Sequence, residues 1–298
     1  MQYKKILLIV NPKAGLSNFS RYNVFDIIVE FCENDCITTT FTTLKEGDAT
    51  RLTEEYAKDY DMIVCSGGDG TLNETVSALM RKGINIPIGY IPSGSTNDMA
   101  RTLEIPLKVK RAAKLIMSSD AKPFDVGKFC DDKYFCYTAS FGAFTKVSYS
   151  TPRKLKNIFG HMAYIFKGIS SAIEELVPIN AKIEADGEIY EGEFILGGIF
   201  NAKSVGGLVR LDKSDVLLDD GKFELLLIKN PKNLDVLNKI LNGLSKQKFD
   251  NEHIIMKKVS SAVFTFEDEV PWSLDGEFGG KTKRAEIKNL HNAISIIR

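Results

Sequence analysis

Short apolar runs alternate with helical patterns along the first third of the chain. Lys5–Val10 is a continuous apolar run with β-branched residues, which predicts a strand buried on both faces, as in a parallel sheet. Tyr22–Cys32 has apolar residues at helical spacing. This alternation predicts an open α/β domain. The expected strands are Lys5–Val10, Ile37–Phe41, Met62–Val64 and Ile86–Pro92, and the expected helices include Tyr22–Cys32, Thr50–Lys58, Thr75–Met80 and Val109–Ser118.

The pattern changes at Ala121–Phe129, which we interpret as a domain boundary. Strand patterns dominate from there on, and Leu155–Leu176 is the main helical exception. Asp186-Gly187 predicts a two-residue hairpin turn. A strand-rich second half predicts a β-sandwich domain packed beside the first. The expected strands are Tyr134–Ala139, Asn180–Ala185, Glu193–Asn201, Phe223–Ile228, His253–Val259 and Ala262–Phe266.

Composition argues against a nucleic-acid-binding protein, a disulfide-rich or zinc-binding protein, and a membrane-spanning protein. The 298 residues carry 39 basic and 39 acidic side chains, so the formal net charge is zero and we expect no nucleic-acid partner. Five cysteines without paired CxxC spacing argue against a zinc site or a disulfide framework, and favour a reducing cytoplasm. No run approaches the ~20 apolar residues of a membrane span, and we expect a soluble protein.

Three polar turns follow three of the expected strands. They are Asn11–Gly15, Cys65–Glu74 and Ser93–Asp98. The middle one reads Cys-Ser-Gly-Gly-Asp-Gly-Thr-Leu-Asn-Glu, and its glycines let backbone N–H groups face an anion just before a helix begins. The spacing fits neither a Walker A loop nor GxGxxG. Because parallel strands end at the same edge of a sheet, we expect the three turns to converge into a phosphate site.

The segment after the second expected strand adds one candidate. The Thr43 hydroxyl could reach a nucleotide or could bond the turn backbone, and the sequence leaves both open. We expect the Asp48 carboxylate to cap the following helix.

These turns, together with one later motif, support a family resemblance. Asn11–Gly15, Gly67–Glu74, Pro92–Asp98 and Leu274–Glu277, in this order, resemble the diacylglycerol kinase catalytic-domain family, most closely its soluble bacterial lipid kinases. The Gly-Gly-Asp-Gly-Thr run alone would also fit an NAD kinase. The late Leu-Asp-Gly-Glu is far more specific to lipid kinases. Ser95 departs from the usual threonine but keeps a hydroxyl.

The resemblance implies two domains. Residues 1–124, joined by a returning segment at 284–298, would form a Rossmann-like parallel α/β domain that binds ATP. Residues 125–283 would form a β-sandwich domain that binds the lipid substrate.

The resemblance also implies the nucleotide site. Asp69 would carry Mg²⁺ that bridges to ATP, since bare phosphate would repel its carboxylate, and Asp98 and Asp125 are weaker candidates for an outer metal network. The residues expected to bind the nucleotide are Asn11, Pro12, Lys13, Ala14, Gly15, Thr43, Gly68, Asp69, Gly70, Thr71, Leu72, Asn73, Glu74 and Thr96.

Asp275 is the expected general base for the attacking lipid hydroxyl. Glu277 would support it, and the two side chains would share a face if this segment were extended. The residues alone favour an ordinary Asp-Gly hairpin turn here; the family resemblance favours catalysis.

An acidic turn at Asp215–Phe223 suggests a second cation site. Clustered oxygen ligands suit a hard cation, but a solvated acidic turn explains the same residues. By resemblance, a structural Mg²⁺ would bind Asp220 and the main-chain carbonyl groups of Leu217 and Lys222.

The sequence therefore predicts an ATP- and Mg²⁺-dependent lipid kinase with diacylglycerol as the first-choice acceptor. Phosphatidylglycerol, a sphingoid base or NAD as the acceptor remain alternatives, and so does a nucleotide-sensing regulator without turnover. We expect a cytoplasmic protein that is peripheral to the membrane during turnover, with a homodimer left open.

Overall fold

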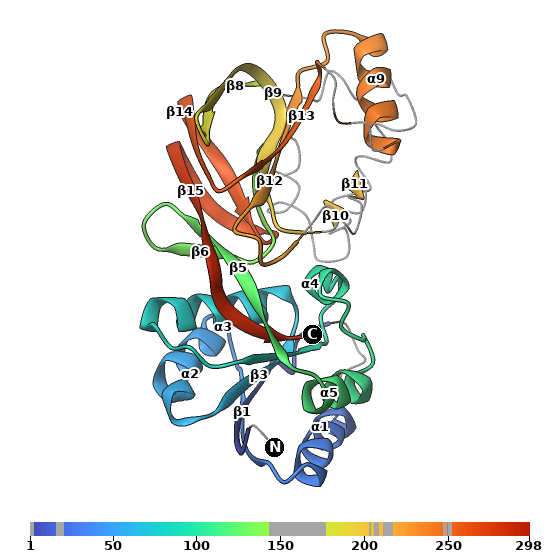
Figure 1. Cartoon of the computed structure of the whole chain (residues 1–298), viewed down its shortest axis with the longest axis vertical. Helices are drawn as coiled ribbons and strands as arrows, with labels where there is room; N and C mark the ends of the chain where they lie inside the picture. The colour runs from blue at the N-terminus through green and yellow to red at the C-terminus, as the bar shows by residue number, and fades with distance from the viewer. Residues whose placement is uncertain are drawn as a thin grey trace. The chain divides into compact units, whose positions relative to one another are not determined.

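The computed structural model describes residues 3–15, 21–142, 177–202, 204–205, 209–210, 217–246, 249 and 252–298 (Figure 1). The helix expected at Leu155–Leu176 lies outside these ranges. The chain divides into two compact units, residues Met1–Val126 with His291–Arg298, and residues Gly127–Leu290. The fold is mixed α/β with a large sheet.

The first unit is built on a parallel sheet. Its strands are β1 (Lys5–Val10), β2 (Ile37–Thr42), β3 (Met62–Gly67) and β4 (Ile88–Pro92), in the order β2-β1-β3-β4. All six residues of β3 and five of the six in β1 are buried, as the continuous apolar runs predict. The four strands expected in this part of the sequence are thus confirmed: β1 has the expected bounds, and each of the other three differs at one end by one to three residues.

Helices cover both faces of this sheet. In Figure 1, α2 and α3 lie on one side of it and α1 and α5 on the other; within each pair the helices are in contact. The helical elements are α1 (Arg21–Glu33), α2 (Asp48–Tyr56), the 3₁₀ turn η1 (Ala57–Asp59), α3 (Asp69–Lys82), α4 (Asp98–Thr102) and α5 (Val109–Ser118).

The C-terminal residues belong to the first unit. The long strand β15 (Glu277–Ile297) pairs in parallel with β4 through Ile296 and Ile88. The Asn292 N–H donates to Asp125 Oδ1 at 2.7 Å, and the Asp125 side chain is fully buried. Asp125, a weak candidate for the metal network, therefore anchors the end of the chain.

The second unit is antiparallel. Its short elements are β6 (Lys133–Phe135), β7 (Thr138–Gly142), β8 (Ile179–Ala185), β10 (Ser204–Val205), β11 (Val209–Arg210), β12 (Phe223–Lys229), α9 (Leu234–Ser245) and β13 (Ile254–Val259), and its long strands are β9 (Glu188–Phe200) and β14 (Ser261–Leu274). β9 and β14 each pair with β8 along one half and with β7 along the other, so this hydrogen-bonded path closes on itself.

Aromatic residues fill the core of the second unit. Trp272 is fully buried, and the rings of Phe129, Phe141, Phe264 and Phe266 lie with their centroids 5.1 to 6.1 Å from its own. Burial of such large side chains is a major stabilising contribution. The segment Ala121–Phe129, expected as a boundary, is one continuous strand (β5), and the division between the units falls inside it.

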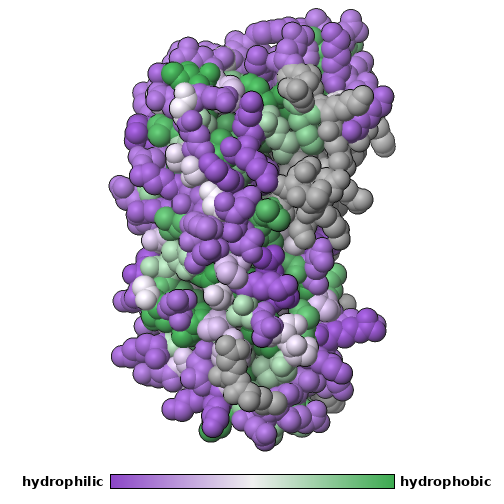
Figure 2. All heavy atoms as spheres, in the orientation of Figure 1, coloured by the Kyte–Doolittle hydropathy of each residue, from purple (hydrophilic) through white to green (hydrophobic). Residues whose placement is uncertain are grey.

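On the face in Figure 2, hydrophilic side chains cover most of the surface and hydrophobic ones are scattered among them, as is normal for a folded chain. In the part of the chain that the structure describes, no helix has both the length and the apolar character of a membrane span.

Candidate active site

The three polar turns meet at one edge of the parallel sheet. A Cβ atom added to Gly15 would lie 2.5 Å from the Ser93 carbonyl oxygen, and one added to Gly94 would lie 2.6 Å from Gly68 Cα. Glycine is therefore required where the first and third turns touch and where the second and third turns touch. The predicted convergence of the turns is confirmed.

Asn11 ties the first turn to the second. Its N–H donates to the Ser66 carbonyl at 2.8 Å, and its Nδ2 donates to Thr71 Oγ1 at 3.1 Å. Lys13 extends this link, because its Nζ donates to the Leu44 carbonyl at 2.8 Å. Within this structure the Lys13 ammonium group thus contacts the loop that follows β2.

Asp69 ties the second turn to the third. Its Oδ2 accepts the Asp98 N–H and its Oδ1 accepts the Met99 N–H, both at 3.0 Å, at the start of α4. The Tyr90 hydroxyl lies 3.5 Å from Oδ1. The side chain expected to carry metal therefore also binds the first N–H groups of a neighbouring helix.

The carboxylates of Asp69 and Asp98 form an electrostatically strained pair. Burial raises the pKa of Asp69, and burial together with the charge of Asp69 raises the pKa of Asp98. Arg101 Nη1 lies 3.6 Å from Asp98 Oδ1 and acts to lower the pKa of both carboxyl groups, but burial outweighs it. Two neighbouring carboxylates are suitable ligands for a divalent cation such as Mg²⁺.

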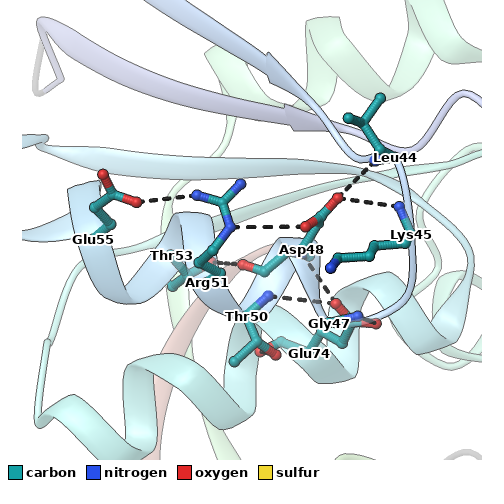
Figure 3. Close-up of polar contacts among 10 residues, drawn as sticks. Leu44, Lys45, Gly47, Asp48, Thr50, Arg51, Thr53, Glu55 and Glu74 are labelled. Carbon is teal, nitrogen blue, oxygen red and sulfur yellow. Dashed lines mark hydrogen bonds and ion pairs between the residues drawn. The ribbon is translucent and has the colours of Figure 1, made fainter.

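Glu74 caps helix α2, and the expectation that Asp48 does so is wrong. Glu74 Oε1 accepts the Gly47 N–H at 3.1 Å, and Oε2 accepts the N–H groups of Ala49 at 3.1 Å and Thr50 at 3.4 Å (Figure 3). Asp48 is the first residue of the helix rather than its cap, and its carboxylate points back into the preceding loop.

The remaining nucleotide candidates differ in accessibility. Thr43 is buried and its N–H donates to the Val10 carbonyl, whereas Thr96 is exposed. Leu72 is fully buried in the core and its N–H donates to the Gly68 carbonyl, so its side chain cannot contact a ligand. The other candidates in the first two turns, Pro12, Ala14, Gly70 and Asn73, are at least partly exposed.

Two serine hydroxyl groups at the same edge lack a partner within the described residues. Ser66 is the second-last residue of β3, Ser93 directly follows β4, and both Oγ atoms are buried. Buried hydroxyl groups are normally hydrogen-bonded, so Ser93, a partly exposed residue, could bond an incoming group, whereas Ser66 is as fully buried as Leu72. Ser66, Ser93 and Asn97 lie in the predicted turns but were not among the expected site residues. The Asn97 side chain bonds the Gly94 N–H and the Gly94 carbonyl at 2.9 Å each.

Asp275 occupies a hairpin turn in the second unit. Leu274 pairs with Glu277, and Asp275 and Gly276 both have positive φ, so the hairpin geometry that the residues favour is confirmed. This segment is a turn rather than an extended strand, so the condition under which Asp275 and Glu277 would share a face is not met. Glu277 is exposed, whereas Asp275 is only 6% exposed.

The Asp275 carboxylate is held by backbone donors. Oδ2 accepts the Cys136 N–H at 2.7 Å, and Oδ1 accepts the N–H groups of Tyr137 and Thr138 at 2.9 Å each. Asn201, which sequence reasoning missed, supports the same segment: its Nδ2 donates to the Cys136 carbonyl at 3.3 Å. The only signal in the sequence was an asparagine directly after an apolar run; that Asn201 is fully buried is known from the structure.

In the acidic turn of the second unit, a lysine ammonium group pairs with the Asp220 carboxylate. Asp220 Oδ1 accepts the Lys222 N–H at 3.0 Å, and Oδ2 lies 3.3 Å from Lys258 Nζ. Leu217 is half exposed. Across the described ranges no group of three His, Cys, Asp or Glu side chains is placed to hold a metal. The predicted Mg²⁺ site therefore fits poorly with the side chains as they lie, because Lys258 already neutralises its one carboxylate.

Comparisons with known proteins agree with these motifs. The model of the diacylglycerol kinase catalytic domain matches residues 5–129. A diacylglycerol kinase of Bacillus subtilis (strain 168) is 32% identical over 99% of this chain and 96% of its own, and one of Staphylococcus haemolyticus is 33% identical over 97% and 86%.

The fold is shared with solved structures of the same kind. Two structures from Bacillus anthracis strain Sterne, both assigned to the diacylglycerol kinases, match with TM-scores of 0.85 and 0.78. They are 28% and 27% identical to this chain, and each match covers all of this chain and 97% of the other. The chain therefore belongs to the bacterial diacylglycerol kinase family.

Proposed function

We propose that this protein transfers a phosphoryl group from ATP to the hydroxyl group of a lipid, with diacylglycerol as the acceptor and phosphatidic acid as the product. The observation that carries the proposal is the meeting of Asn11–Gly15, Gly67–Glu74 and Ser93–Asp98 at one sheet edge, in a chain of this family. In the proposed arrangement the first unit is a Rossmann-like ATP domain, and the second unit is a β-sandwich domain that binds the lipid.

The nucleotide phosphates would lie against the glycines of the second turn. Helix α3 begins directly after Gly68 without a side-chain cap, so its first N–H groups can bind an anion. The hydroxyl groups of Thr71, Ser93 and Thr96 lie on the same turns and would add donors. Thr43 would contribute from the neighbouring loop through its main-chain carbonyl group, because its side chain is buried and its N–H is bonded to Val10.

Asp69, with Asp98 beside it, would hold Mg²⁺. When bound, the metal would neutralise charge on the ATP phosphates, which is the main catalytic contribution that phosphoryl transfer needs. Asp69 would keep its hydrogen bonds to the start of α4, so one carboxylate would both hold the third turn and face the cation. Repulsion between Asp69 and Asp98 supports this assignment.

Asp275 would accept the proton of the lipid hydroxyl group. Its three backbone donors fix the orientation of the carboxylate, and a general base must be positioned within hydrogen-bond reach of the proton it accepts. Glu277, exposed at the next strand start, would assist in orienting the acceptor. Because the acceptor resides in a bilayer, we propose that the protein works at the membrane surface.

A labelled-phosphate assay tests the proposal. Radiolabelled ATP and diacylglycerol in mixed micelles should yield a labelled lipid, and removal of Mg²⁺ with a chelator should stop the transfer. Binding of ATP without transfer to any acceptor would instead favour the nucleotide-sensing alternative.

A further inference from the structure

A carboxylate of helix α3 is bonded to the start of helix α2. Three backbone N–H groups, those of Gly47, Ala49 and Thr50, donate to Glu74 (Figure 3). The Thr50 hydroxyl also donates to the Glu74 main-chain carbonyl at 3.4 Å. The first N–H groups of a helix have no partner within the helix, and the N-cap residue of α2, Gly47, has no side chain to accept them. Glu74 supplies the missing acceptor from α3.

The loop before α2 is held at its other end as well. The Leu44 N–H donates to Asp48 Oδ2 at 2.8 Å, and the Leu44 carbonyl accepts from Lys13 Nζ. The Thr43 N–H is bonded to the end of β1. The segment from Thr43 to Thr50 is therefore fixed by the first turn on one side and by Glu74 on the other.

The direction of the Glu74 carboxylate decides its role. Both oxygens accept N–H groups at the positive end of α2, where a negative charge is favourable. A bound phosphate would repel the same carboxylate. Glu74 belongs to the motif that resembles a nucleotide site, yet its side chain is used to hold a neighbouring loop.

We propose that Glu74 is a positioning residue that fixes the Thr43–Thr50 segment beside the nucleotide turns and binds neither phosphate nor metal. The proposal rests on the proposed ATP site in the first unit. It predicts that loss of the Glu74 carboxylate loosens this segment first and weakens ATP binding as a consequence.

Three variants separate positioning from direct binding. Glu74→Ala removes the carboxylate, and Glu74→Gln keeps one oxygen that can accept an N–H. Glu54→Ala is the matched control, because Glu54 on α2 pairs with Arg81 on α3 at 3.2 Å. The control removes another carboxylate link between the same two helices, away from the turns.

The readouts are amide hydrogen exchange of the protein without nucleotide, and ATP affinity by calorimetry at several Mg²⁺ concentrations. In Glu74→Ala we expect exchange at Gly47, Ala49 and Thr50 to accelerate at least about tenfold, and ATP to bind about tenfold more weakly, in line with loss of a helix cap. Glu74→Gln should fall between the wild type and Glu74→Ala. Glu54→Ala should match the wild type in both, and the Mg²⁺ requirement should stay constant throughout.

Unchanged exchange in Glu74→Ala would overturn the positioning role, and so would faster exchange with undiminished ATP affinity. A raised Mg²⁺ requirement would show that Glu74 binds metal directly. If the wild-type protein itself fails to bind ATP, the proposed function falls, whereas the exchange data still decide whether Glu74 holds the segment.

Discussion

Gly15 and Ser93 lie so close together that a Cβ atom on Gly15 would come within 2.5 Å of the Ser93 carbonyl oxygen. Gly15 also has a φ of +73°, a region in which residues with a Cβ are strained. The first and third turns can approach each other only because this position has no side chain. The proposed nucleotide site therefore requires glycine at position 15, because a side chain there would push the first and third turns apart.

Gly15→Ala should weaken ATP binding by about tenfold or more, because the added methyl group pushes the Ser93 turn away from the other two. Gly83→Ala is the matched control: Gly83 also has positive φ, at +62°, but an added Cβ meets no described atom within 4 Å. Both variants should lose about 1 kcal/mol of stability from backbone strain. Calorimetric ATP titration of the two variants checks this. Equal ATP affinities in the two variants would contradict the account.

Asp275→Asn should lower kinase activity by at least about 100-fold, the range of general-base catalysis, while ATP affinity stays near that of the wild type. The amide also places an NH₂ group where backbone N–H donors point, so we expect a lower melting temperature. Asp186→Asn is the control, because Asp186 occupies the same position of another Asp-Gly hairpin turn. Turnover of Asp275→Asn comparable to that of Asp186→Asn would rule out the base.

Asp186 should contribute stability that depends on pH. Burial works to raise its pKa, but the backbone N–H of Ser260, the Lys222 ammonium, the Ser260 hydroxyl and the Ser261 N–H outweigh burial and hold the pKa well below its usual range. A lowered pKa in the folded state stabilises the protein above the unfolded-state pKa of about 3.9, and this stabilisation is lost as the pH falls below it.

Asp186→Asn should therefore be about 2 kcal/mol less stable than the wild type at pH 7, and this difference should shrink at about pH 2.5. Asparagine tolerates the positive φ at this turn, so the variant tests the charge rather than the backbone. Urea unfolding at the two pH values measures the effect. A difference that does not change with pH would mean that the carboxylate charge has no such role.

The predicted structural Mg²⁺ at Asp220 can be tested through Lys258. If Lys258 takes the place of a cation there, Mg²⁺ should raise the melting temperature of Lys258→Ala more than that of the wild type. Asp220→Asn should abolish the Mg²⁺ effect in either background. If Mg²⁺ leaves the melting temperature of all of these proteins unchanged, the result would argue against the site.

The sequence predicted those parts of the fold that depend on local pattern. Lys5–Val10 is a strand with the expected bounds, because a continuous apolar run fits a strand buried on both faces. The three turns converge because parallel strands share one edge. The Asp186-Gly187 turn is confirmed, since few other residue pairs adopt two positive φ angles readily.

Patterns failed where strands are exposed or where contacts are distant. β9 begins at Glu188, five residues before the expected start, because its first half is largely exposed and polar. β14 continues through exposed acidic residues to Leu274 for the same reason. The contact between Glu74 and Gly47 joins residues 27 positions apart and depends on how α2 packs on α3. Leu72 was expected to bind the nucleotide because it lies within the Gly-Gly-Asp-Gly-Thr-Leu motif. Its position on α3 instead directs its side chain into the core.

Phosphoryl transfer to a lipid is the central claim, and an acceptor panel tests it most directly. The wild-type protein is incubated with radiolabelled ATP and Mg²⁺ in mixed micelles that contain diacylglycerol, phosphatidylglycerol or a sphingoid base, with NAD tested in parallel. The account predicts label in phosphatidic acid, formed from diacylglycerol, at rates well above those for the other acceptors. Label transferred to NAD, or to no lipid at all while ATP binds normally, would contradict it.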